Sequence, residues 1–127
     1  MTDAARGIAP RDGLSWVAGA TEPPLIELTI PQLLAQTVAR WPDRPAAVFR
    51  AQGLRWTWAE FAAQVDRVAA GLLAAGLGRG DRLGIWAPNR AEWLLAQFAT
   101  ARIGVILVAI NPAYRVHELD YALRKTG

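Results

Sequence analysis

Apolar side chains recur at intervals of three and four residues in four segments of this chain, and shorter apolar runs lie between those segments. This spacing places side chains on one face of a helix, because an α-helix has about 3.6 residues per turn. The pattern therefore predicts four helices: between Thr29 and Pro42, between Thr57 and Gly76, from Asn89 to about Ile103, and from Val116 to Gly127.

Polar residues mark where the first three helices begin. Thr29 can cap the first helix, and a proline follows it in the first turn, where a missing N–H does no harm. Thr57 and Glu60 match a capping box, in which each side chain satisfies a backbone amide of the other residue. The third helix is expected to repeat this logic from Asn89, three residues before Glu92.

Shorter apolar stretches between the helices predict β-strands. Ala46–Phe49 and Leu54–Thr57 flank a short glycine-bearing link, so they are expected to form a β-hairpin. Arg82–Ala87 and Val105–Ile110 lie on either side of the third helix, which predicts a βαβ unit of right-handed connection. The run from 105 to 110 is continuously apolar, which is typical of a parallel strand buried on both faces.

Together these elements predict an α/β fold, a β-hairpin plus a βαβ unit with flanking helices, that is incomplete as a domain. A buried parallel strand needs a strand on each edge and helices on both faces, and the expected elements are too few. Residues 1–28, with several glycines and prolines, are interpreted as an irregular lead-in segment in which Trp16 docks on the domain. Residues 29–127 are interpreted as one portion of a larger domain.

Composition and charge exclude several classes of protein. A hydrophobic share of 53% is too high for a disordered tail. The net charge of +3 comes from arginines that alternate with acids, whereas a nucleic-acid footprint needs clustered cations, so no nucleic-acid partner is expected. The absence of cysteine excludes disulfides, zinc fingers and thiol nucleophiles, and the one histidine cannot hold a metal cluster by itself.

The sequence pattern is not that of a membrane or secreted protein. The longest uninterrupted apolar run, Val105–Ile110, is far shorter than the ~20 residues that span a bilayer. The first residues carry an early acid and no apolar stretch, unlike a secretory signal. We therefore expect no transmembrane segment and a cytoplasmic location.

Three features resemble functional motifs without matching them. The glycines of segment 76–80 follow a helix and precede a strand, the reverse of a dinucleotide-binding loop, so they predict a plain turn. His117 and Asp120 share a face of the last helix, but no nucleophile is placed near them and they are interpreted as solvated surface. For Trp86, which lies beside a Pro-Asn turn, both packing and contact with a ligand stay open.

Three segments in order resemble a known family. Trp56–Phe61 resembles the early Thr-Tyr-x-Glu-Leu motif of adenylate-forming enzymes, the AMP-binding superfamily, with aromatic substitutes. Gly80–Trp93 resembles the strand and helix that come next, and Ala101–Leu119 resembles the second core motif. By their order and spacing, residues 29–127 resemble the N-terminal region of these enzymes, truncated before the phosphate loop. Segment 110–119 is most similar to the fatty-acyl-CoA synthetase branch.

The resemblance implies a two-step ligase. ATP would activate a fatty acid or other carboxylate as an acyl-adenylate, and the thiol of CoA would then displace AMP, with Mg²⁺ assisting the phosphate chemistry. The family's phosphate loop, nucleotide-binding motifs and catalytic lysine have no counterpart here, so no catalytic residue or metal ligand is carried over and the chain alone is expected to be inactive. In the family, a basic residue after the Asn-Pro turn can approach the nucleotide phosphate of CoA, and Arg115 is the nearest candidate.

The alternative is a stand-alone, non-enzymatic α/β module that binds a partner through an unpaired sheet edge. The same edge leads us to expect self-association, because uncovered apolar edge strands pair with other chains. Copurification of a defined complex would favour the module, and a reading frame that continues past Gly127 would favour the ligase portion.

Overall fold

The computed structural model of the chain describes residues 13, 19–20 and 22–127. Its elements are α1 (Ile30–Arg40), β1 (Pro45–Phe49), a 3₁₀ turn η1 (Arg50–Gln52), β2 (Leu54–Thr57), α2 (Trp58–Ala74), β3 (Arg82–Trp86), α3 (Ala91–Ile103), β4 (Ile106–Ile110) and α4 (Val116–Thr126). None of these helices is long and apolar enough to cross a membrane. The expected docking of Trp16 lies outside the described residues.

The first two helices begin where the sequence predicts. Gln32 N–H donates to Thr29 Oγ1, and Thr29 N–H donates back to Gln32 Oε1 over 2.8 Å. Thr57 and Glu60 form the same reciprocal pair at the start of α2. These pairs satisfy amides that a helix leaves without partners in its first turn, so each helix starts at a defined residue.

The hairpin also forms as predicted, and its link is a single 3₁₀ turn. β1 and β2 pair antiparallel, with Phe49 opposite Leu54. η1 carries the chain from one strand to the other, and Gly53 ends it at φ 65°, a left-handed conformation that glycine adopts at low steric cost. This turn brings Gln52 to the start of α3.

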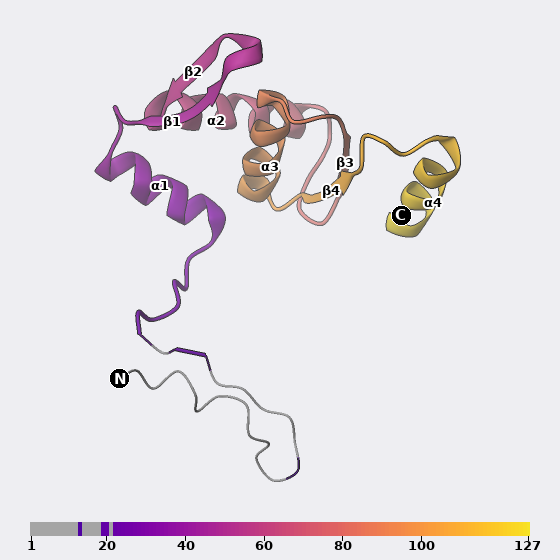
Figure 1. Cartoon of the computed structure of the whole chain (residues 1–127), viewed down its shortest axis with the longest axis horizontal. Coiled ribbons are helices and arrows are strands. Elements are labelled where there is room, and N and C mark those ends of the chain that lie inside the picture. The colour runs from indigo at the N-terminus through magenta and orange to yellow at the C-terminus, as the bar shows by residue number, and fades with distance from the viewer. Residues whose placement is uncertain (1–12, 14–18, 21) are drawn as a thin grey trace, which may run out of the picture.

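The βαβ unit is confirmed. β3 and β4 pair in parallel, from Arg82 opposite Ile106 to Trp86 opposite Ile110, and α3 connects them. The strand pair and the hairpin form two separate two-stranded sheets. In Figure 1 the hairpin, α2 and α3 lie close together, while α4 lies at the far end of the molecule from α1.

The buried core lies between α1, α2 and α3. Its buried apolar side chains are Leu34, Phe61, Val65, Ala69, Leu95 and Ala99. Aromatic rings extend this core toward the hairpin, since Phe61 lies edge-on to Phe98 at 5.1 Å between centroids and stacks on Trp56 at 6.3 Å. Burial of apolar area is the main stabilising contribution to folding, so this core holds the βαβ unit in place.

The prediction that β4 is buried on both faces is wrong for the described residues. Ile110 at its end and Val105 just before its start are buried, whereas Ile106, its first residue, is 49% exposed. In the described part of the chain, β3 is the one strand that pairs with β4, and α3 is the helix that packs most closely on it. Too little of the chain therefore covers the rest of β4.

The prediction that Asn89 caps α3 is also wrong. The N-cap residue is Arg90, and its side chain makes no capping hydrogen bond. The first helical amide, Ala91 N–H, instead donates to Gln52 Oε1 over 2.8 Å. A residue of the hairpin link thus takes the place that the sequence pattern gave to a local cap.

Candidate functional site

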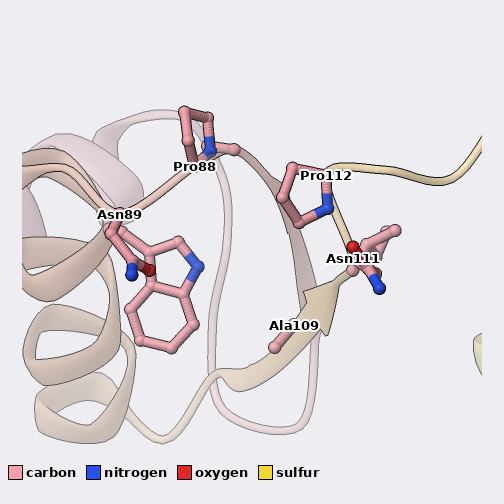
Figure 2. A pocket seen from close by; sticks show the side chains of 8 residues that line it. Pro88, Asn89, Ala109, Asn111 and Pro112 are labelled. Atoms are coloured by element: carbon pink, nitrogen blue, oxygen red, sulfur yellow. The ribbon is translucent and has the colours of Figure 1, made fainter.

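A cleft opens where β3 and β4 end, beside the start of α3 (Figure 2). Its volume is about 540 Å³, and its lining comes from the ends of the strands and the segments that follow them: Ala87, Pro88, Asn89, Trp93, Ala109, Ile110, Asn111 and Pro112. Open α/β sheets bind ligands beyond the carboxyl ends of their parallel strands. This cleft is therefore the candidate binding site.

The lining of the cleft suits binding more than acid–base chemistry. Proline, alanine, isoleucine and tryptophan side chains form most of its walls, and Asn89 and Asn111 lie on opposite sides of it (Figure 2). None of the lining residues has a side chain that titrates near neutral pH or acts as a nucleophile. The cleft can hold a ligand through apolar contacts and amide hydrogen bonds.

Asn111 fixes the turn after β4 by accepting three hydrogen bonds. Its carbonyl oxygen accepts from Tyr114 N–H at 3.0 Å and from the Trp86 indole Nε1–H at 3.1 Å. Its side-chain Oδ1 accepts from Ala113 N–H at 3.0 Å, a turn that asparagine favours. Because Trp86 ends β3, these bonds tie the end of one strand to the turn that follows the other.

Arg115 lies just beyond this turn, as the N-cap residue of α4. Its backbone N–H donates to Glu118 Oε2 at 3.1 Å, and the residue is exposed. The ion pairs formed among the described residues do not include it. An exposed guanidinium near the positive end of a helix dipole fits a phosphate group, since its planar fork matches the phosphate oxygens.

The other motifs of the sequence are surface and turn features, as predicted. His117 and Asp120 are exposed, and Asp120 pairs with Arg124 one turn further along α4, at 2.8 Å. The glycine segment forms a turn between α2 and β3, in which Gly80 N–H donates to the Gly104 carbonyl at 2.9 Å. That amide therefore has a hydrogen-bond partner within the protein.

A polar cluster near the cleft was missed by sequence reasoning. Gln52 Nε2 donates to both carboxylate oxygens of Glu92, at 3.0 and 3.2 Å, and Arg90 pairs with the same carboxylate. Hydrogen bonds from its own backbone N–H, from Arg90 and from Gln52 lower the pKa of Glu92 from 4.5 to about 2. No local signal marks Gln52, because its partners are 39 and 40 positions away.

The described residues provide neither a metal site nor a cationic cradle for phosphates in the cleft. In the part of the chain that the structure describes, no group of three or more acidic, histidine or cysteine side chains is placed to hold a metal. The sequence has no glycine-rich loop that ends in Lys-Ser or Lys-Thr, and the cleft lining carries no cation. Arg115 does not line the cleft and is an exposed cation at the carboxyl-end side of the strand pair.

Comparison with known proteins connects this chain to one enzyme family. Residues 34–127 match the sequence model of the AMP-binding enzyme family. The chain is 58% identical over 111 residues to "Medium-chain acyl-CoA ligase ACSF2, mitochondrial" of Danio rerio, a match that covers 87% of this chain and 18% of that protein. It is 48% identical over 118 residues to the human protein of the same name, covering 93% of this chain and 19% of that one.

Solved structures share the fold. The N-terminal domain of FACL13 from Mycobacterium tuberculosis matches with a TM-score of 0.72 at 29% identity, covering 76% of this chain and 24% of that one. O-succinylbenzoate coenzyme A synthetase (MenE) from Bacillus subtilis, in complex with AMP, matches with a TM-score of 0.71 at 32% identity, covering 76% and 25%. The predicted α/β fold, that of the N-terminal part of an acyl-CoA synthetase large domain, is confirmed.

The match covers most of this chain but only a small share of the length of its relatives. It covers all elements from the middle of α1 to the end of α4. The chain spans 18–19% of the length of the curated relatives described above. The resemblance carried by the three sequence segments is thus confirmed, and the chain belongs to the AMP-binding enzyme family, of which it holds an N-terminal portion.

Proposed function

We propose that this chain supplies the N-terminal portion of an ATP-dependent fatty-acid–CoA ligase that acts on medium-chain acids. The observation that carries the proposal is the 58% identity over 111 residues to a relative named as a medium-chain acyl-CoA ligase. In such a ligase ATP converts the carboxylate into an acyl-adenylate, and the CoA thiol then displaces AMP to give the thioester. In this proposal residues 29–127 form the N-terminal portion of the AMP-binding domain, up to a point before the phosphate loop, and residues 1–28 are an irregular lead-in segment.

Within that ligase most residues of this chain form the structural scaffold, and one of them is proposed to contact CoA. The core between α1, α2 and α3 holds β3 and β4, and the carboxyl ends of these strands frame the cleft. Arg115 is proposed to bind the nucleotide phosphate of CoA. The groups that would bind ATP and Mg²⁺ are not provided by the residues described above, so the chain is proposed to be inactive by itself.

A rebuilt ligase tests the proposal. This protein is the Danio rerio relative in which residues 29–127 of the present chain replace the aligned segment. With ATP and hexanoate, octanoate or dodecanoate, it should exchange labelled pyrophosphate into ATP, whereas the 127-residue chain alone should stay at background. Acid-dependent exchange by the chain alone would contradict its inactivity, and a folded rebuilt ligase without exchange would contradict the assigned function.

The proposed role of Arg115 is tested in the same rebuilt ligase. Arg115→Ala should raise the KM for CoA by about tenfold, the loss of one charge-assisted contact, while the rate of pyrophosphate exchange is unchanged. The matched control is Arg124→Ala, because Arg124 is an exposed arginine of the same helix that pairs with Asp120. If Arg115→Ala leaves the KM for CoA unchanged, Arg115 is an ordinary surface residue.

The exposed sheet edge favours a second candidate function, a stand-alone module that binds a protein partner. In the described chain β3 and β4 pair with each other alone, and Trp86 and Ile106 are 51% and 49% exposed. Unpaired edge strands pair with other chains, so the isolated chain is expected to self-associate. Light scattering that shows a monodisperse monomer with a sharp melt would contradict this, and copurification of one defined partner would favour the module.

We keep the cytoplasm as the expected location of the ligase, although the names of the vertebrate relatives include the word mitochondrial. A fluorescent fusion of the complete reading frame in its native cell, imaged with a mitochondrial marker where the cell has mitochondria, tests this. Diffuse fluorescence is the expected result, and overlap with the marker would contradict it.

A further inference from the structure

Trp86 ends β3 with an indole that is half-exposed and hydrogen-bonded across the strand pair. Its backbone lies opposite Ile110, the last residue of β4, and its Nε1–H reaches one residue further, to the carbonyl of Asn111 at 3.1 Å. The residue is 51% exposed. The indole N–H therefore links the end of β3 to the turn after β4, a bond that an aromatic ring without a donor could not make.

The turn that receives this hydrogen bond attaches α4 to the sheet. The Asn111 carbonyl also accepts from Tyr114 N–H, and the Asn111 side chain accepts from Ala113 N–H. No residue of α4 is buried, and the helix lies apart from α1, α2 and the hairpin (Figure 1). The direction in which α4 leaves the sheet, and with it the position of Arg115 at its first turn, therefore depends on how firmly this turn is held.

We propose that Trp86 is a positioning residue for the CoA step of the ligase. By donating its indole N–H to the Asn111 carbonyl, Trp86 holds the turn in one conformation and places Arg115 where it meets the nucleotide phosphate of CoA. The inference rests on the proposed function and on the proposed role of Arg115. A binding group that is held in place before the ligand arrives loses less conformational freedom on binding, and the ligand then binds more tightly.

The test is Trp86→Phe in the rebuilt ligase, since phenylalanine keeps an aromatic ring and removes the donor. The KM for CoA should rise about fivefold, the effect of one hydrogen bond between uncharged groups, while acid-dependent pyrophosphate exchange keeps its rate. The matched control is Trp41→Phe, which removes an indole N–H at the end of α1, far along the chain from the cleft. That variant should leave the KM for CoA unchanged.

Comparison with Arg115→Ala separates the inference from the function on which it rests. If Arg115→Ala raises the KM for CoA and Trp86→Phe does not, the positioning role is overturned and the proposed function stands. If Trp86→Phe lowers pyrophosphate exchange as much as thioester formation, Trp86 is merely structural and the inference is also overturned. If neither variant changes the KM for CoA, both the role of Arg115 and the positioning role are overturned.

Amide hydrogen exchange tests the inference without depending on the activity of the enzyme. The Tyr114 amide donates to the same carbonyl that accepts from Trp86, so it reports on the turn directly. In Trp86→Phe its exchange should be about fivefold faster than in the unmodified rebuilt ligase, while the Ala91 amide at the start of α3 keeps its rate. Equal exchange rates at Tyr114 in the two proteins would overturn the inference, whether or not the ligase turns over.

Discussion

Replacing Gln52 by alanine should destabilise the start of α3, although Gln52 belongs to the hairpin link. Its side chain accepts from Ala91 N–H at 2.8 Å and donates to the Glu92 carboxylate at 3.0 and 3.2 Å. Ala91 is 1% exposed, so Gln52→Ala leaves the first amide of α3 without its partner in a buried position. The same change breaks the polar connection between the hairpin link and the third helix.

The magnitude follows from the capping bond. Losing the side-chain cap and leaving the buried Ala91 amide without a partner describe the same lost hydrogen bond, which costs about 1 kcal/mol in the free energy of unfolding. With a urea dependence of about 1.5 kcal/mol per molar for a chain of this size, the unfolding midpoint should fall by about 0.7 M. Tryptophan fluorescence follows this transition in the 127-residue chain at low concentration.

A control variant in α1 and hydrogen exchange at Ala91 test whether the effect is specific to Gln52. Gln36 is an exposed glutamine of α1 whose side chain takes no part in the hydrogen bonds of the described residues, so Gln36→Ala should leave the midpoint nearly unchanged. Gln52→Asn keeps the amide but shortens its reach, and should lose the cap as well. Hydrogen exchange at Ala91 should accelerate in both Gln52 variants. A midpoint and an Ala91 exchange rate equal to those of the unmodified chain would refute the role of Gln52.

The remaining predictions concern a carboxylate and two glycines. The pKa of Glu92 is lowered from 4.5 to about 2, so its stabilising contribution is fully present above pH 4.5 and is lost as the pH falls toward 2. Glu92→Gln should therefore be less stable than the unmodified chain in urea at pH 6, and this difference should shrink between pH 4.5 and 2; a difference that does not change with pH would contradict the assignment. Gly104 ends α3 at φ 75°, where an added Cβ would lie 3.0 Å from Arg79 Cγ, so Gly104→Ala should cost about 1–2 kcal/mol in urea unfolding. Gly71→Ala, in the exposed interior of α2 with nothing within 4 Å, should instead stabilise by about 0.5–1 kcal/mol, and equal effects at the two glycines would contradict this argument.

The secondary structure was predictable because its signals are local. Helical spacing and the reciprocal capping pair of Thr57 and Glu60 lie within one segment each, and both appear in the structure as expected. The hairpin and the parallel pair of β3 and β4 follow from short apolar runs with a glycine link or a helix between them. Adjacent residues determine these features, so sequence patterns are sufficient to predict them.

The contacts that join the elements were not predictable in this way. Asn89 has the local sequence of a helix cap, yet Gln52 takes that role because the hairpin link folds back onto α3. The indole of Trp86 finds its acceptor 25 residues further along the chain. Likewise, the exposure of Ile106 depends on how much of the chain packs over β4, which no pattern within the strand reveals.

The turn beside the candidate site was predictable from the sequence, whereas the cleft itself was not. The Asn-Pro sequence after the run from 105 to 110 indicates a turn at the carboxyl end of a strand, and the structure places Arg115 just past that turn. The cleft also needs the segment after β3, including Asn89 and Trp93, and this pairing arises from the parallel register. Residues that are close only because two strands align cannot be grouped by their spacing.

The most direct test of the central claim is the rate at which the rebuilt ligase forms octanoyl-CoA. The account predicts a rate within about tenfold of that of the unmodified Danio rerio relative, because residues 29–127 are proposed to supply the same scaffold and the two chains are 58% identical over the matched 111 residues. Circular dichroism and the melting temperature establish that the rebuilt protein is folded. A folded rebuilt ligase that forms no octanoyl-CoA above the background without enzyme would contradict the claim that this chain is a working portion of an acyl-CoA ligase.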